Sequence, residues 1–328
     1  MTPVTVAFLL HAGIERLRMA GSESPRLDAE LLLGHALRVD RTALIAHSDA
    51  PVGADAAAVY EAGLVRRISG EPVAYIRGFK EFHGLALSTD PRALIPRPET
   101  ELLVDLVVAA IVDRLVSAPR PPGTPALRVI DVGTGAGSIA IAVAVELRKR
   151  RIDDDVSLIA TDASPDALQL ARENAVGHGV ADRIQFELGD LVPWDATLFD
   201  VVAANLPYIP SGALPGLPVA ASFEPVMALD GGPDGLDLVR RLLEQLGRVL
   251  QVNGLAFLEI GSEQGSAVVD ATTALGPGWQ ASVVPDLAGH DRVARIERTA
   301  VAREPEAVAE PAAGSALEPG SAAAAPDA

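Results

Sequence analysis

The segment best suited to chemistry on a nitrogen atom consists of Asn205, Leu206, Pro207 and Tyr208. An amide or amino nitrogen is a poor nucleophile because its lone pair is delocalised, so a site must hold its two hydrogens and aim the lone pair at a methyl group. The side-chain oxygen of Asn205 and the main-chain oxygen of Leu206 can each accept one hydrogen. Pro207 stiffens the turn, and the Tyr208 ring offers a face to a planar group. The alternative is an ordinary turn after a strand.

A glycine-rich turn lies upstream of this segment and is suited to holding a nucleotide-type cofactor. It consists of Gly133, Thr134, Gly135, Ala136 and Gly137. Glycines at a strand-to-helix turn let the backbone approach a ligand that lies over the helix N-terminus. Nicotinamide dehydrogenases use a related turn, and three glycines can also form a tight corner without any ligand.

Two acidic residues follow at positions where later strands are expected to end. Asp162 comes about 25 residues after the glycine turn, where a carboxylate can accept both ribose hydroxyls of a nucleoside. Its alternative role is to cap the helix that starts at Pro165, a role for which Ser164 competes. Asp190 follows the next strand, where its carboxylate could accept the exocyclic amine of an adenine. The alternative is an acid in a solvated loop.

The elements that must position these residues alternate between strand and helix. We expect strands at 128–132, 156–161, 184–188, 199–203 and 255–260, and helices at 138–149, 165–176 and 235–250. Strands separated by helices of this length form a parallel sheet covered on both faces, with ligands at the carboxyl ends of the strands. The fold class is therefore α/β.

The remaining sequence predicts further units on either side of the α/β region. Residues 1–78 have helical spacing, with Ser24 and Pro25 starting one helix and another at 55–68, so we expect a small helical bundle. We predict a hairpin linker at 79–95, the α/β domain at 96–300 with a proline-rich loop at 117–125, and a disordered tail at 301–328.

Composition narrows the possible functions. The chain has 328 residues, no cysteine and a net charge of −17, which counts against extensive phosphate contacts with nucleic acid. The six histidines show no ligand spacing, so we expect no metal. The first residues lack a basic leader, and prolines interrupt the uncharged stretch at 201–223, so we expect a cytoplasmic protein with neither a signal peptide nor a membrane span.

The sequence resembles the release factor glutamine methyltransferases up to about Arg298. Besides the glycine turn and the Asn205 segment, the likeness includes Pro-Arg-Pro-Glu-Thr-Glu at 96–101, Phe-Glu-Pro at 223–225, Ala-Leu at 228–229 and Asp-Gly-Leu at 234–236. The run at 96–101 is the most specific of these. One departure is Leu206, where the family usually has proline. The Leu206 carbonyl survives this change, but the turn loses one rigid ring.

This resemblance implies a Rossmann-like class I methyltransferase domain and an N-terminal helical domain that docks a protein substrate. It implies S-adenosylmethionine held by the glycine turn, Asp162, Asp190, Leu191 and Asn205. The implied substrate is the glutamine of the Gly-Gly-Gln motif in class 1 peptide chain release factors.

Two other readings of the sequence compete with this expectation. Adenine dimethyltransferases of ribosomal RNA tend to carry Asn-Leu-Pro-Tyr, so the acceptor could be an adenine amino group in nucleic acid, although the acidic charge and the runs at 96–101 and 223–225 argue against it. The chain could also be a cofactor-binding module without turnover. A dehydrogenase is less favoured than either, because it has no use for the Asn205 segment.

Overall fold

The N-terminal helices form where apolar side chains recur at helical spacing and polar residues cap the first turn. Helix α1 (Val6–Met19) begins at Thr5, whose hydroxyl accepts a hydrogen bond from the Phe8 N–H at 3.3 Å. Helix α2 (Pro25–Leu37) begins after Ser24, as predicted, but this hydroxyl donates to Asp28 and does not cap the helix. The further helices are α3 (Arg41–Ala46), α4 (Ala54–Ile68) and α5 (Val73–Arg77). Their facing apolar side chains form a core of their own around Leu33 and Tyr60.

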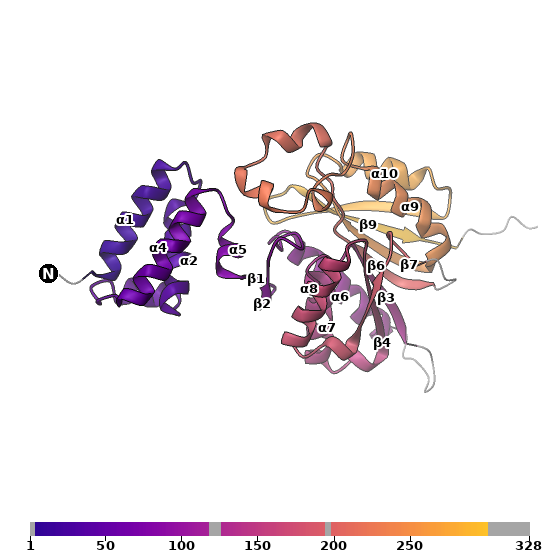
Figure 1. Ribbon diagram of the computed structural model, residues 1–328. Helices are drawn as coiled ribbons and strands as arrows, with labels where there is room; N and C mark the ends of the chain where they lie inside the picture. Colours follow the sequence, from indigo (N-terminus) through magenta and orange to yellow (C-terminus); the bar gives the residue numbers. More distant parts are fainter. Residues whose placement is uncertain (1–3, 118–125, 194–197, 301–328) are drawn as a thin grey trace, which may run out of the picture.

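The computed structural model describes residues 4–117, 126–193 and 198–300, and it shows these helices beside an α/β domain (Figure 1). A hairpin of β1 (Phe79–Phe82) and β2 (Leu85–Ser88) connects the two parts. The predicted tail at 301–328 lies outside the described residues, as does all but the first residue of the predicted loop at 117–125. None of the described helices is long and apolar enough to cross a membrane.

The α/β domain is built on one seven-stranded sheet of order β5-β4-β3-β6-β7-β9-β8. Its strands are β3 (Leu127–Val132), β4 (Val156–Asp162), β5 (Ile184–Leu188), β6 (Phe199–Ala204), β7 (Leu250–Glu259), β8 (Trp279–Pro285) and β9 (Asp291–Arg298). The first five are parallel to one another, and β9 pairs antiparallel with both of its neighbours, β7 and β8.

Helices cover both faces of this sheet because its strands are apolar on both sides (Figure 1). Helices α6 (Thr100–Ser117), α7 (Ser138–Arg150) and α8 (Pro165–Gly177) lie on one face, where Leu103 and Ile141 are fully buried. Helices α9 (Asp237–Val249) and α10 (Gly265–Thr273) lie on the other face, with Leu242 and Val268 in its core. The predicted Rossmann-like α/β domain with an N-terminal helical bundle is confirmed.

One predicted boundary is wrong. The sequence favours a helix to Leu250 and a strand from Leu255, but β7 begins at Leu250, directly after α9. Leu250 pairs with Phe199, and the register then shifts so that Leu255 pairs with Val201. Asn253, with φ of +65°, and Gly254 form this irregularity inside the strand, and such residues are typical of turns.

Candidate active site

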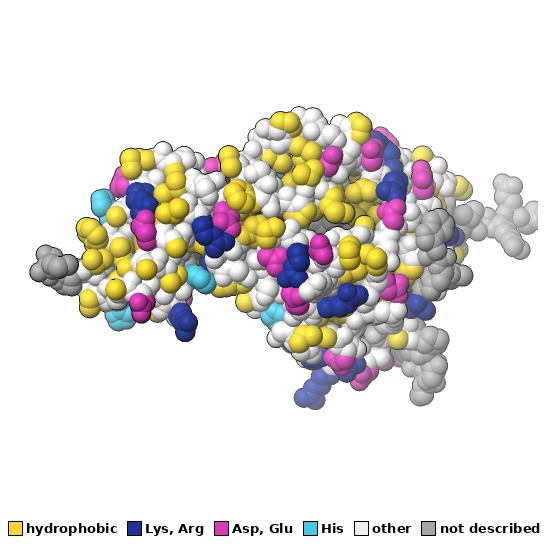
Figure 2. Space-filling model, viewed as in Figure 1, with side chains coloured by type: hydrophobic (Ala, Val, Ile, Leu, Met, Phe, Trp, Pro, Cys, Tyr) yellow, Lys and Arg dark blue, Asp and Glu magenta, His cyan; other side chains and the backbone are white. Residues whose placement is uncertain are grey.

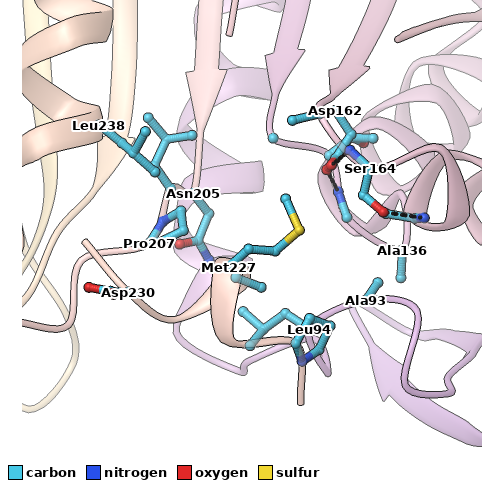
Figure 3. Close-up of a pocket in the computed structure, with 18 of the residues that line it drawn as sticks. Ala93, Leu94, Ala136, Asp162, Ser164, Asn205, Pro207, Met227, Asp230 and Leu238 are labelled. Atoms are coloured by element: carbon cyan, nitrogen blue, oxygen red, sulfur yellow. Dashed lines mark hydrogen bonds between the residues drawn. The ribbon is translucent and has the colours of Figure 1, made fainter. Parts of the chain in front are cut away.

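A cavity of about 940 Å³ opens at the carboxyl ends of β3, β4 and β6. This is the point where the strand order reverses, because β4 lies on one side of β3 and β6 on the other. Figure 3 shows Asp162 and Ala136 on one side of the cavity and Asn205 and Pro207 on the other, with the Met227 side chain between them. The cavity therefore brings together all the predicted cofactor and substrate residues except Gly137 and Tyr208, which do not line it.

The glycine turn forms the floor of the cavity and requires glycine at three positions. Gly133, Gly135 and Gly137 have φ of +74°, +55° and +85°, a region that favours glycine. The main-chain N–H groups of Gly133 and Thr134 both donate to the Thr161 carbonyl at 2.9 Å, which fixes the turn against β4. A Cβ added to Gly135 would meet no protein atom within 4 Å, because this residue faces the open cavity.

Asp162 ends β4 and is tied to the glycine turn. Its Oδ2 accepts the Gly135 N–H at 2.8 Å, and its Oδ1 accepts the Ser164 N–H at 2.9 Å. Burial raises the pKa of Asp162, and these main-chain bonds oppose the rise. Ser164 caps α8 by accepting the Ala167 N–H at 3.2 Å, so Asp162 is not needed as the cap. Each Asp162 oxygen retains capacity for a second donor from the cavity.

Asp190 and Leu191 lie at the rim beyond β5 and β4. The Asp190 carboxylate pairs with Arg241 at 2.5 Å and is 64% exposed. Leu191 has a φ of +67°, and its carbonyl accepts the Thr161 hydroxyl at 2.7 Å. Both residues line the cavity, but the carboxylate of Asp190 already has a cationic partner.

Asn205 follows β6 directly, and its amide group has a defined orientation. Its Nδ2 donates to the Thr100 hydroxyl at 2.9 Å. Within the described ranges, no donor bonds Asn205 Oδ1 or the main-chain oxygen of Leu206. The Leu206 side chain is buried and packs over Gly133, where an added Cβ would lie 3.0 Å from its Cδ2. Two free acceptors thus come from adjacent residues that both line the cavity.

Pro207 also lines the cavity, whereas Tyr208 is not among the described lining residues. The Tyr208 hydroxyl instead donates to Glu259 at 3.3 Å, and the Tyr208 carbonyl accepts from Gln264 at 3.0 Å. Burial, followed by the nearby Glu259 charge, raises the pKa of Tyr208 to about 12. The stacking role of Tyr208 stays a prediction.

Asp131 is a functional candidate that the sequence argument left without a role. It is the second-last residue of β3, beside the glycine turn, and is 1% exposed. Its Oδ2 accepts the Thr134 hydroxyl at 2.6 Å and the Ala140 N–H at 3.1 Å, whereas its Oδ1 has no partner in the part of the chain described. Burial raises the pKa of Asp131 to about 7. The Asp131 carboxylate thus connects the glycine turn, through Thr134, to the first turn of α7, through Ala140.

The two motifs at 96–101 and 223–225 meet at one buried carboxylate. Glu224 accepts the Ile95 N–H at 3.0 Å and pairs with Arg97 at 2.6 Å, while its own side chain is only 3% exposed. This contact joins segments 127 residues apart and closes one wall of the cavity. The sequence shows both motifs, but nothing in their spacing predicts that they touch.

The cavity suits a nucleoside-type cofactor at its glycine-turn end. Gly135 presents space instead of a side chain, and Asp162 offers two partly used oxygens beside it. Where the chain is described, no group of three or more His, Cys, Asp or Glu side chains could hold a metal ion.

Comparisons with known proteins add the family context. Residues 9–78 match the model for the PrmC N-terminal domain, and residues 124–276 match a methyltransferase domain model. The chain is 41% identical over 290 residues to the release factor glutamine methyltransferase of Moorella thermoacetica, covering 88% of this chain and 97% of that protein. It is 35% identical over 291 residues to the protein of the same name from Deinococcus radiodurans, covering 88% and 97%.

Among solved structures, the chain is similar to the release-factor-specific protein-(glutamine-N5) methyltransferase of Alicyclobacillus acidocaldarius. The identity is 27% and the TM-score 0.37, over 65% of this chain and 100% of that one.

Proposed function

The chain belongs to the release factor glutamine methyltransferase family, and we propose that it methylates the side-chain amide nitrogen of the glutamine in the Gly-Gly-Gln motif of class 1 peptide chain release factors. S-adenosylmethionine is the methyl donor of its methyltransferase domain. The protein is thus a protein-(glutamine-N5) methyltransferase, and the release factor is its proposed partner.

The observation that carries the proposal is the pair of free acceptors at the end of β6. Asn205 and Leu206 both line the cavity, and neither Asn205 Oδ1 nor the Leu206 carbonyl has a donor from the described protein, whereas a primary amide has two N–H groups to give. One N–H of Asn205 is taken by the Thr100 hydroxyl, which fixes the amide with its oxygen as the end that has no donor among the described residues. The site is therefore complementary to a donor of two hydrogens.

We assign the cofactor and the substrate amide to different residues of the cavity. We assign the cofactor to Gly133, Gly135, Asp162 and their neighbours, and the substrate amide to Asn205 and its neighbours on the opposite side of the cavity (Figure 3). S-adenosylmethionine supplies an electrophilic methyl group when bound. Asn205 and Leu206 would accept the two N–H groups in the plane of the amide, so that the nitrogen lone pair, which is perpendicular to this plane, can face the methyl group. Such alignment is the main source of rate in a direct transfer.

The remaining predicted cofactor residues have supporting contributions. Thr134 and Ala136 line the cavity within the turn, and Gly137 is the N-cap residue that precedes α7. Asp190 and Leu191 lie at the rim, where we place the base of the cofactor. Pro207 and Tyr208 would hold the acceptor turn, the segment at 205–208 that carries the two free acceptors, in place on the substrate side.

We also propose that residues 1–78 dock the release factor, that 79–95 link the two parts, and that 96–300 carry out methyl transfer. Tyr75 supports this arrangement, because its hydroxyl donates to the Ala93 carbonyl at 2.9 Å and so connects α5 to the cavity wall. The reaction would take place in the cytoplasm, where release factors act.

An adenine amino group also carries two N–H donors, so nucleic acid is the competing substrate class. The net charge of −17 argues against it, since affinity for nucleic acid comes mainly from clustered Lys and Arg. On the face shown in Figure 2, described Lys and Arg side chains are interspersed with Asp and Glu instead of forming one basic patch.

The test is a transfer assay with methyl-labelled S-adenosylmethionine. We expect label on a class 1 release factor and none on the same factor with its Gly-Gly-Gln glutamine changed to alanine. Label on RNA or DNA but not on the release factor would favour the adenine reading. Cofactor binding in calorimetry with no labelled product from any substrate would favour a binding module.

A further inference from the structure

A buried hydrogen-bonded chain runs from Glu259 to the amide of Asn205. Thr100 Oγ1 donates to Glu259 Oε2 at 2.6 Å, and Asn205 Nδ2 donates to Thr100 Oγ1 at 2.9 Å. Glu259 is 1% exposed and Thr100 is 2% exposed. Tyr208 donates to the second Glu259 oxygen at 3.3 Å. The carboxylate therefore meets two hydroxyl donors that flank the acceptor turn.

The fold brings these residues together although they are far apart in the sequence. Thr100 begins α6, and Glu259 ends β7. Ala204 pairs with Leu258, so the residue that follows each of them lies on the same rim of the sheet. Asn205 and Glu259 are those two residues, and the start of α6 lies between their side chains.

The direction of each hydrogen bond follows from the inventory of donors. Burial raises the pKa of Glu259, and the Thr100 hydrogen bond, the Arg292 charge and the Tyr208 hydrogen bond oppose the rise. In its ionised form this carboxylate only accepts, so the single proton of the Thr100 hydroxyl is committed to it. The Thr100 oxygen can then only accept from Asn205, and only the NH₂ end of the Asn205 amide can donate to it. The amide oxygen is therefore the end that Thr100 does not bond, and it belongs to a residue that lines the cavity.

We propose that Glu259 and Thr100 are positioning residues that set the orientation of the Asn205 amide, so that its oxygen instead of its NH₂ group meets the substrate. This inference rests on the proposed function of Asn205. A reversed amide would present two donors to a substrate that is itself a donor, and the amide hydrogen would lose its acceptor. Thr100 and Glu259 would thereby select a substrate NH₂ group over a carbonyl.

Kinetics of a matched pair of Thr100 variants test the proposal. Thr100→Ser keeps the hydroxyl, and we expect kcat within about threefold of the unchanged protein. Thr100→Val keeps the shape without the hydroxyl, and we expect kcat to fall by about tenfold or more, with cofactor Kd changed less than about twofold. In an Asn205→Ala background, Thr100→Val should cause no further loss, because Thr100 acts through Asn205. An equal loss in both backgrounds, or no loss in either, would overturn the proposal.

A second measurement needs no activity and so separates this inference from the proposed function. Nitrogen-15 spectra of the full chain should show slow hydrogen exchange at the Asn205 side-chain NH₂, assigned by its absence in Asn205→Ala. The exposed Asn253 provides the reference for fast exchange. Protection should persist in Thr100→Ser and be lost in Thr100→Val. If the Asn205 NH₂ exchanges as fast as that of Asn253 in the unchanged protein, Thr100 does not hold it and the inference is wrong, whatever the substrate.

Discussion

Asp162 Oδ2 accepts the main-chain N–H of Gly135 at 2.8 Å, so the carboxylate at the end of β4 is anchored to the turn that follows β3. This single contact joins the two halves of the proposed cofactor site. It also holds the Asp162 side chain in place before any ligand binds, which lowers the entropic cost of binding.

Removing this carboxylate should weaken cofactor binding. We expect Asp162→Ala to raise the Kd for S-adenosylmethionine about 10- to 100-fold, since hydrogen bonds to a charged group contribute about 1.5–3 kcal/mol. Calorimetry measures the change. Asp182→Ala is the matched control, because that carboxylate is exposed, pairs with Arg183 and does not line the cavity, and we expect its effect to stay within about twofold. Equal effects of the two variants would contradict the assignment of the ribose to Asp162.

Two glycines of the same turn should respond differently to alanine. Both have positive φ, so each substitution costs about 1–2 kcal/mol in backbone strain. At Gly137 the added Cβ would also lie 2.8 Å from Ile141 Cδ1, whereas at Gly135 it would enter the open cavity. We expect Gly137→Ala to lower the melting temperature more, and Gly135→Ala to lose more cofactor affinity. The reverse order would show that the cofactor does not lie over Gly135.

The buried Asp131 predicts a specific dependence of stability on pH. Burial raises its pKa from 3.8 to about 7, so the folded state keeps a proton that the unfolded state releases. Its contribution to the free energy of unfolding is therefore complete below pH 3.8 and is lost as the pH rises through about 7. Relative to Asp131→Asn, the unchanged protein should lose roughly 2–4 kcal/mol between pH 4 and 7.5. Urea unfolding at several pH values measures this, and parallel curves for the two proteins would contradict it.

The Glu224 contact should stabilise the wall of the cavity. Glu224→Ala leaves the buried Ile95 N–H without its acceptor, and we expect the free energy of unfolding to fall by about 1–3 kcal/mol. The exposed Glu263 supplies the control. We expect Glu263→Ala to change the free energy of unfolding by less than about 0.5 kcal/mol. Urea unfolding compares the two variants. A Glu224 effect as small as that of the control would mean that the wall does not depend on this carboxylate.

Local sequence patterns predicted the central elements well. The buried runs expected at 128–132, 156–161 and 199–203 form the parallel strands β3, β4 and β6. The glycine turn follows β3 and the Asn205 segment follows β6, as expected. The pattern failed inside β7, where Asn253 and Gly254 have the composition of a turn but belong to a strand irregularity. The sequence-based interpretation also gave no prediction for β8 and β9, the antiparallel edge of the sheet.

The supporting residues of the site were out of reach of sequence patterns for a physical reason. Thr100 and Glu259 are 159 residues apart, and each is a common residue type in an ordinary position, at a helix start and a strand end. Only the sheet order, which places β7 next to β6, brings them to Asn205. Periodicity and spacing report local structure, whereas this contact depends on topology.

The most direct test of the account is single-turnover methyl transfer by Asn205→Ala at saturating S-adenosylmethionine, with a class 1 release factor as substrate. Asn205 Oδ1 is one of two acceptors proposed to hold the glutamine amide, and deleting one aligned polar group from an active site typically slows the reaction by a hundredfold or more. We therefore expect a rate at least about a hundredfold below that of the unchanged protein. A rate close to that of the unchanged protein would show that Asn205 does not position the amide.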